Sequence, residues 1–336
     1  MKKIKDTEVR WGILGVGNVC EVKSAPAMKI IPNSKLVAVM RRDEEKVIDY
    51  AKRHGVSKWY TDAQQLIDDP EVNAIYIATP PNAHLELTNL AAVAGKPVYV
   101  EKPMARTFEE CQKMIQTCEE SGVPLYVAYY RRTLPHFLRI KELMDQGVLG
   151  EIRSVHINLK QPLKPTIVAN LENNWRINPE IAGGGYFFDL ASHQLDLLDF
   201  FFGKITQASG FCSNQGNAYE AEDIVVGSFV FESGVMGTGN WCFTSSENSE
   251  IDEVVIYGSK GVIRFETFGK GEFSFEVDGK NKELFQFDLP KHIQEPLIKS
   301  IVEDLLGTGI CPSTGESGAR TNCVMEELTK KRIDKV

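Results

Sequence analysis

The chain has 336 residues, of which 43% are hydrophobic and 25% are charged, and its formal net charge at pH 7 is −8. These are the values of an ordinary globular protein, and a chain of this length is expected to form two domains. The negative charge argues against a nucleic acid or an anionic membrane as a partner.

The seven cysteines lie far apart in the sequence and include no Cys-x-x-Cys pair. This pattern predicts reduced thiols, with neither a disulfide framework nor a metal site. Polar residues follow the lysines at positions 2, 3 and 5, so the chain does not begin with the pattern of a signal peptide. No apolar run approaches the roughly 18 residues that a membrane-spanning helix needs. We therefore expect a cytoplasmic protein.

The first part of the chain alternates short apolar runs with amphipathic segments. Strands are expected at 9–14, 36–40, 58–60, 74–78, 98–100 and 125–128, with helices between them. Strands that alternate with helices predict a doubly wound parallel sheet of the Rossmann type. We place this domain at residues 1–128.

Two glycines form the turn after the first predicted strand. Gly15 and Gly17 stand directly before Asn18 and Val19, where a helix is expected to begin. At such a turn, glycines let the backbone approach the pyrophosphate of a dinucleotide. The third position of the Gly-x-Gly-x-x-Gly motif is Cys20, and two glycines alone are equally typical of a tight structural turn.

Two arginines follow the second predicted strand, roughly 20 to 25 residues after the glycines, where a dinucleotide site reads the adenosine ribose. Arg41 and Arg42 suit the 2′-phosphate of NADP better than the hydroxyls of NAD. The alternative is two solvated arginines, with Asp43 as the N-cap of a helix over 44–54. We expect NADP as the preferred cofactor, with NAD as the alternative.

A polar segment, Thr79–His84, follows the strand at 74–78. Ligands bind at the carboxyl ends of the strands in open α/β sheets, so Thr79, Pro80 and Asn82 are expected near the cofactor. His84 either orients a group near the cofactor or has a structural role at the start of the next helix.

The strand at 98–100 ends in Glu101-Lys102-Pro103. Read alone, this tripeptide is most often a strand end with a solvated lysine. The order of the strands, however, places Lys102 at the same sheet edge as Gly15, Arg41 and Thr79. We therefore expect Lys102 to belong to a ligand site.

The second part of the chain consists mainly of short strand-like runs separated by polar or glycine-containing turns. Runs at 152–159, 223–231, 235–244, 252–257, 261–266, 272–277 and 282–287 predict a large open, mainly antiparallel sheet within an α+β domain at 129–336. The exposed face of such a sheet needs cover, which another subunit would supply. We expect a homodimer or homotetramer formed through this sheet.

One apolar helical stretch of this domain carries polar residues on one face. Asp189 and His193 are four residues apart, after the glycines at 183–185. The pair is either part of a site or a local carboxylate–imidazole pair that satisfies itself. Zinc is a weaker interpretation, because further ligands at the required spacing are missing.

Four of these motifs occur in an order and spacing that resemble the glucose–fructose oxidoreductase, inositol dehydrogenase and rhizopine-catabolism family (Gfo/Idh/MocA) across essentially the whole chain. They are Gly15-Val16-Gly17, Thr79–His84, Glu101-Lys102-Pro103, and the glycines at 183–185 with Asp189 and His193. The resemblance implies an NAD(P)-dependent oxidoreductase acting on a carbinol or carbonyl of a sugar, cyclitol, dihydrodiol or related polyol. It also implies a cis Lys102–Pro103 peptide and assembly through the open sheet.

The resemblance further implies that Lys102, Asp189 and His193 form the catalytic set. Lys102 and His193 would meet the reacting oxygen, one as acid/base and the other as hydrogen-bond donor, while Asp189 orients His193 or binds a substrate hydroxyl. Further candidates for substrate contacts are Tyr129, Arg131 and Arg176, for which solvated or structural roles are equally open. The residues expected to contact the cofactor are Gly15, Gly17, Asn18, Val19, Arg41, Arg42, Thr79, Pro80, Asn82, His84, Glu101 and Lys102.

Two other functions remain open at this stage. One is a nicotinamide-dependent hydrolase or eliminase that oxidises its substrate transiently and regenerates its cofactor. The other is a dinucleotide-binding sensor without catalysis, against which the presence of Lys102, Asp189 and His193 argues.

Overall fold

The computed structural model describes residues 4–163 and 174–333, which fall into two compact units. The first unit contains the chain up to Tyr130 together with Pro290–Ala319, and the second contains Arg131–Leu289 and the residues from Arg320 onwards. The first domain expected from the sequence ended at residue 128, close to this division. The sequence did not predict that residues 290–319, which follow the second sheet in the chain, belong to the first unit.

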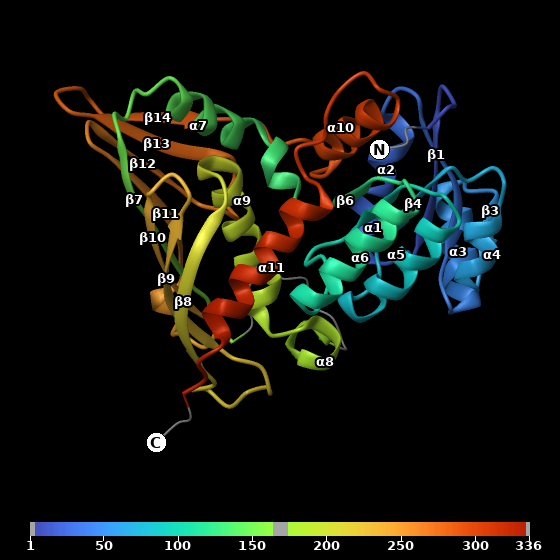
Figure 1. Cartoon of the computed structure of the whole chain (residues 1–336), viewed down its shortest axis with the longest axis horizontal. Helices are drawn as coiled ribbons and strands as arrows, with labels where there is room; N and C mark the ends of the chain where they lie inside the picture. Colours follow the sequence, from blue (N-terminus) through green and yellow to red (C-terminus); the bar gives the residue numbers. More distant parts are fainter. Residues whose placement is uncertain (1–3, 164–173, 334–336) are drawn as a thin grey trace. The chain divides into compact units, whose positions relative to one another are not determined.

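The first unit is built on a parallel sheet of six strands in the order β3-β2-β1-β4-β5-β6 (Figure 1). The strands are β1 (Val9–Leu14), β2 (Ser34–Met40), β3 (Lys58–Tyr60), β4 (Ala74–Ile77), β5 (Val98–Val100) and β6 (Leu125–Val127). The strand order reverses between β1 and β4, which is where open α/β sheets bind their ligands. The predicted Rossmann sheet is confirmed.

Helices cover both faces of this sheet. The helices of the unit are α1 (Asn18–Val22), α2 (Ala25–Ile30), α3 (Glu44–His54), α4 (Ala63–Asp68), α5 (His84–Val93), α6 (Phe108–Glu120) and α10 (Glu295–Leu305). Side chains of α4, α5 and α6 pack with the apolar residues of β4 and β5 in one core cluster. On the opposite face, Tyr126 of β6 donates to Asp304 of α10 (3.0 Å between Oη and Oδ2), so the returning segment covers that side.

The second unit is built on a sheet of eight strands in the order β14-β13-β12-β11-β7-β10-β9-β8. The strands are β7 (Ile152–Lys160), β8 (Ile205–Ser213), β9 (Ile224–Phe231), β10 (Met236–Cys242), β11 (Ile251–Gly258), β12 (Gly261–Phe265), β13 (Glu272–Val277) and β14 (Glu283–Gln286). β7 and β10 pair in parallel, and the other neighbouring strands in the described part of this sheet pair antiparallel. The predicted open, mainly antiparallel sheet is confirmed, although β8 was not among the predicted strands.

Helices of the second unit cover one face of its sheet (Figure 1). The covering helices are α7 (Pro135–Asp145), α9 (Ser192–Phe202) and the part of α11 (Gly315–Thr329) from Arg320 onwards, and the unit also contains the short helix α8 (Pro179–Ala182). Phe137 of α7 and Phe201 of α9 both pack against Phe265 of β12, with ring centroids 5.5 and 6.1 Å apart. Arg132 joins α9 through buried ion pairs to Asp196 (2.7 Å) and Asp199 (2.9 Å).

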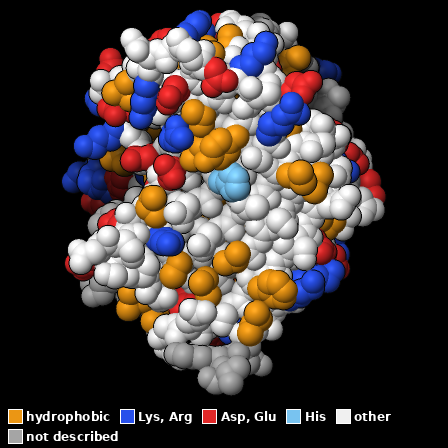
Figure 2. Space-filling view, turned by 90° about the vertical axis from the view of Figure 1, so that its left-hand side faces the viewer, with side chains coloured by type: hydrophobic (Ala, Val, Ile, Leu, Met, Phe, Trp, Pro, Cys, Tyr) orange, Lys and Arg blue, Asp and Glu red, His pale blue; other side chains and the backbone are white. Residues whose placement is uncertain are grey.

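The opposite face of the eight-stranded sheet is open in the described part of the second unit. Figure 2 looks onto this face and shows few charged side chains in its middle. Several large apolar side chains on its strands are exposed, among them Phe211 (54%), Val226 (46%) and Tyr257 (39%). Within residues 4–163 and 174–333, no helix has the length and hydropathy needed to cross a bilayer.

Candidate active site

The glycine turn after β1 lies against the end of β4. Gly15 has a φ of +89°, and a Cβ at this position would lie 2.6 Å from Cγ2 of Thr79, so only glycine fits. A Cβ on Gly17 would meet only the carbonyl oxygen of Gly15, at 3.9 Å, which leaves room beside the turn. The buried Oγ1 of Thr79 has no hydrogen-bond partner among the described residues. An open turn beside an unused hydroxyl fits the phosphates and ribose of a dinucleotide.

Arg41 lies beside this turn. Its Nη1 donates to the carbonyl oxygen of Val16 at 3.1 Å, which holds the half-buried side chain near the glycines. Arg42 is exposed. The predicted N-cap is confirmed, since Oδ1 of Asp43 accepts from the backbone N–H of Lys46 at 3.1 Å.

His84 is fully buried and joins two loops of the sheet edge. Its Nε2 lies 2.8 Å from the carbonyl oxygen of Thr79 and its Nδ1 lies 3.0 Å from that of Met104. Burial lowers the pKa of His84, while the two carbonyls oppose this effect. Because both ring nitrogens face backbone oxygens, the structure favours the structural alternative for this residue.

Glu101 and Lys102 follow β5 at the same edge. The Lys102–Pro103 peptide is cis, as predicted, and Lys102 is half-buried. The carboxylate of Glu101 is buried and accepts hydrogen bonds from Tyr76 (2.6 Å) and Gln294 (2.7 Å). The structure therefore brings Gly15, Thr79 and Glu101 to one edge of the first unit's sheet, as the strand order predicted.

The second unit holds Asp189 and His193 on neighbouring turns. Asp189 lies in the π-helical turn η4 (Phe187–Ala191) and His193 in the first turn of α9. Single π-helical turns occur frequently at functional sites. Arg176 forms an ion pair with Asp189, with 3.2 Å between Nε and Oδ2. Both members of the predicted pair are buried, at 8% and 4% exposure.

Phe268 packs against the imidazole of His193, with ring centroids 6.0 Å apart in an edge-to-face arrangement. Its backbone N–H donates to Oδ2 of Asp252 at 2.6 Å. Burial raises the pKa of Asp252 to about 6. Neither Phe268 nor Asp252 belongs to a sequence motif, so the sequence alone gives no signal for either residue.

Two of the proposed substrate residues have roles in packing. Arg131 is buried, donates to the carbonyl oxygen of Thr267 at 2.9 Å and lies over the ring of Phe268 at 4.6 Å. Tyr129 is fully buried in the core cluster of the first unit. Arg176 contacts Asp189, which belongs to the proposed catalytic set.

Glycines let the chain pack closely before the turn that carries Asp189. A Cβ on Gly184 would lie 2.1 Å from the ring of Phe188, and one on Gly185 would lie 2.8 Å from Cβ of Ala221. The glycines at these two positions are therefore required by packing. In the described part of the chain, no group of three or more His, Cys, Asp or Glu side chains could hold a metal ion.

Known proteins resemble this chain over most of its length. Residues 9–129 match the sequence model of an oxidoreductase family with an NAD-binding Rossmann fold, and residues 137–264 match the C-terminal domain of the same Gfo/Idh/MocA family. The chain is 41% identical to Oxidoreductase P35 of Formosa agariphila, over 96% of this chain and 98% of that protein. It is 29% identical to the 1,5-anhydro-D-fructose reductase of Ensifer adhaerens, over 92% of each chain.

Solved structures share the fold. A levoglucosan dehydrogenase in complex with NADH and levoglucosan superposes with a TM-score of 0.84 at 22% identity, covering 96% of both chains. The two family matches and the long relative at 41% identity are decisive, and they confirm the predicted resemblance. The chain belongs to the Gfo/Idh/MocA family of NAD-binding oxidoreductases.

Proposed function

We propose that this protein transfers a hydride between a nicotinamide dinucleotide and a carbinol or carbonyl carbon of a sugar, a cyclitol, a dihydrodiol or a related polyol. The observation that carries this proposal is the edge of the first unit's sheet, where Lys102 follows β5 beside the turn of Gly15 and Thr79. Relatives named as a 1,5-anhydro-D-fructose reductase, a myo-inositol 2-dehydrogenase and a trans-1,2-dihydrobenzene-1,2-diol dehydrogenase support the substrate class.

Side chains of the protein would exchange the proton with the substrate oxygen and orient the substrate. When bound, the nicotinamide accepts or donates the hydride. We propose that Lys102 and His193 both contact the substrate oxygen, one as the general acid/base and the other as a hydrogen-bond donor. Asp189, neutralised by Arg176, would bind a substrate hydroxyl or orient His193.

We propose NADP as the preferred cofactor. A guanidinium at the end of β2 suits a 2′-phosphate, and the hydrogen bond to Val16 holds Arg41 beside the glycine turn. Thr79, with its unused hydroxyl, and Glu101 would contact the cofactor directly. His84 would act by holding the loops of Thr79 and Met104 together.

The function is tested by following nicotinamide absorbance with a panel of sugars and polyols, after a thermal-shift screen with NADPH and NADH. A dinucleotide at about 100 times its Kd should stabilise the protein by about 2.7 kcal/mol. A stoichiometric net change in absorbance is expected, whereas a hydrolase or eliminase that regenerates its cofactor would give none.

The Lys102→Ala variant should reduce turnover by about 10² to 10⁴, because a placed acid/base contributes on this scale. Lys113→Ala is the matched control, since Lys113 is exposed on α6 and pairs with Glu109. Near-normal turnover in the Lys102→Ala variant, with the same melting temperature as the wild type, would contradict the role of Lys102.

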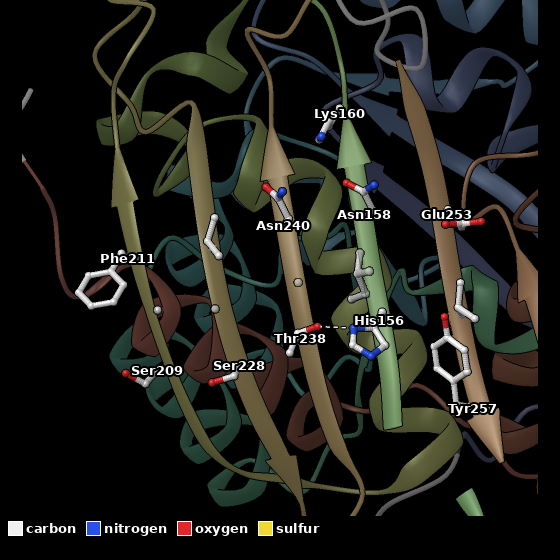
Figure 3. A pocket seen from close by; sticks show the side chains of 16 residues that line it. His156, Asn158, Lys160, Ser209, Phe211, Ser228, Thr238, Asn240, Glu253 and Tyr257 are labelled. Carbon is white, nitrogen blue, oxygen red and sulfur yellow. Dashed lines mark hydrogen bonds between the residues drawn. The ribbon is translucent and has the colours of Figure 1, made fainter. Parts of the chain in front are cut away.

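We also propose that a second copy of the chain covers the open face of the eight-stranded sheet, giving a homodimer or homotetramer. A hollow of about 690 Å³ lies on this face, and Figure 3 shows its lining on β7, β10 and their neighbours. Asn158 and Asn240 are register partners there, and neither buried Oδ1 has a hydrogen-bond partner among the described residues. A facing protein surface would cover the exposed apolar side chains of this face.

A cytoplasmic location remains our proposal. All seven cysteines are free thiols, and five of them are buried. Reduced cysteines are typical of proteins in a reducing compartment.

A further inference from the structure

The carboxylate of Glu101 lies in a buried hydrogen-bond network on the side of the first unit's sheet that α10 covers. Glu101 directly follows β5 and is 9% exposed. Its backbone N–H donates to the carbonyl oxygen of Ile77 at 2.9 Å, which fixes its backbone to the end of β4. The side chain therefore starts from a rigid position.

Both oxygens of this carboxylate accept hydrogen bonds. Oε1 accepts from Oη of Tyr76 at 2.6 Å and from Nε2 of Gln294 at 2.7 Å. Oε2 accepts from the backbone N–H of Lys102 at 3.2 Å. A buried carboxylate is unfavourable unless such donors replace water, and bonds to a charged acceptor are the stronger ones. The network thus fixes the carboxylate and links it to the backbone of Lys102.

Gln294 is itself oriented by a second tyrosine. Oη of Tyr99 donates to Oε1 of Gln294 at 2.9 Å, so the amide nitrogen is turned toward Glu101. The reverse orientation would place the amide oxygen against the carboxylate. Tyr76 and Tyr99 are register partners on β4 and β5, and their rings stack with centroids 4.7 Å apart.

We propose that Tyr76 and Gln294 are positioning residues for the cofactor site. They occupy Oε1 of Glu101 and so hold the carboxylate, and through Oε2 the backbone of Lys102, in one orientation before any ligand binds. The inference rests on the proposed function, because Glu101 and Lys102 are placed at the cofactor there.

Tyr126 provides a matched control. It is the register partner of Tyr99 on β6, and its Oη donates to Asp304 of α10 at 3.0 Å. It therefore has the same chemistry on the same side of the sheet as Tyr76, but its acceptor is not Glu101.

The test compares the Tyr76→Phe, Gln294→Met and Tyr126→Phe variants by fluorescence titration with NADPH and NADH and by thermal unfolding. Loss of one donor to the carboxylate should weaken dinucleotide binding about 10-fold, the scale of one hydrogen bond to a charged group. The Tyr126→Phe variant should bind like the wild type. Equal weakening in all three variants would indicate a general loss of packing under α10 and would overturn the proposal.

The Gln294→Glu variant gives a readout that a purely structural role would not produce. Its new carboxyl can donate to Glu101 only when protonated, so dinucleotide binding should recover as the pH falls. The Gln294→Met variant should stay weak at every pH relative to the wild type. If the Gln294→Met variant does not fold, Tyr76→Phe and the pH profile of Gln294→Glu decide the question.

The possible failures are distinguishable. Wild-type affinity in the Tyr76→Phe and Gln294→Met variants, or a pH-independent Gln294→Glu variant, would overturn the inference and leave the proposed function standing. A wild-type protein that binds neither dinucleotide would overturn both.

Discussion

At the scale of single residues, Arg41 is the side chain on which the proposed preference for NADP over NAD depends. The sequence placed an arginine where the adenosine ribose is read. The structure adds a hydrogen bond from its guanidinium to the carbonyl of Val16, which leaves the remaining N–H groups for an anion. Cofactor preference is thus a question about one or two side chains.

Replacing both Arg41 and Arg42 by alanine should weaken NADPH binding about 10- to 100-fold and NADH binding much less, because only NADPH carries the 2′-phosphate. Isothermal titration with both dinucleotides measures this difference. Arg139→Ala, at a half-buried arginine on α7 that pairs with Glu142, is the control. An equal loss for the two cofactors would remove the argument for NADP.

His84 shows the limit of sequence reasoning at this scale. Its place at the start of α5 suited a cofactor contact and a structural role equally well. Nδ1 of His84 lies within hydrogen-bond distance of the carbonyl oxygen of Met104, which belongs to a loop 20 residues further along the chain. No local pattern encodes that contact, so only the folded chain distinguishes the two roles.

At the scale of elements, α7 carries a buried histidine that makes the stability of the second unit depend on pH. His136 is 2% exposed, and its ring lies 3.9 Å from that of Phe137. Burial, with a smaller effect of Arg131, lowers the pKa of His136 from 6.5 to about 4. Between these values the unfolded chain binds a proton that the folded chain does not, so stability falls as the pH decreases through this range.

Replacing His136 by glutamine should reduce this pH dependence, because glutamine does not titrate. Between pH 7 and pH 5, the wild type should lose about 2 kcal/mol more stability than the variant. Calorimetric melting at both pH values tests this, with His292→Gln, at a half-buried histidine of the first unit, as the control. A wild type and a His136→Gln variant with parallel pH profiles would contradict the expectation.

Most elements followed from local patterns. The helix α3 was predicted at its observed bounds, because Asp43 caps its start and Gly55, with a φ of +62°, ends it. The parallel pairing of β7 with β10 could not be predicted in this way, since it joins strands separated by α9 and two further strands. The π-helical turn at Asp189 could not be predicted either, because the sequence around it has no pattern that distinguishes it from an α-helix.

At the scale of the whole molecule, the proposed assembly depends on the open face of the second sheet. Its middle carries few charges (Figure 2), and Val226 lines the hollow on it. An uncovered sheet face with exposed large apolar side chains, such as Phe211, Val226 and Tyr257, is typical of an interface.

Replacing Val226 by aspartate should therefore shift the protein toward the monomer, because a buried unpaired charge opposes association. Size-exclusion chromatography with light scattering measures the change. Leu138→Asp is the matched control, since Leu138 on α7 is equally exposed, at 46%. A wild-type protein that is monomeric at micromolar concentration would refute the proposed assembly.

The sequence by itself determined the Rossmann sheet, the second sheet and the motifs at Gly15, Thr79, Lys102, Asp189 and His193, because hydrophobic periodicity and turn residues are local properties. Only the tertiary structure decided that residues 290–319 return to the first unit and that Gln294 meets Glu101, 193 positions earlier in the chain. It also brought Arg131 to the carbonyl oxygen of Thr267 and the ring of Phe268, 136 and 137 positions later in the chain. These contacts depend on where distant segments come to lie, and that is set by the burial of whole surfaces and not by the spacing of residues along the chain.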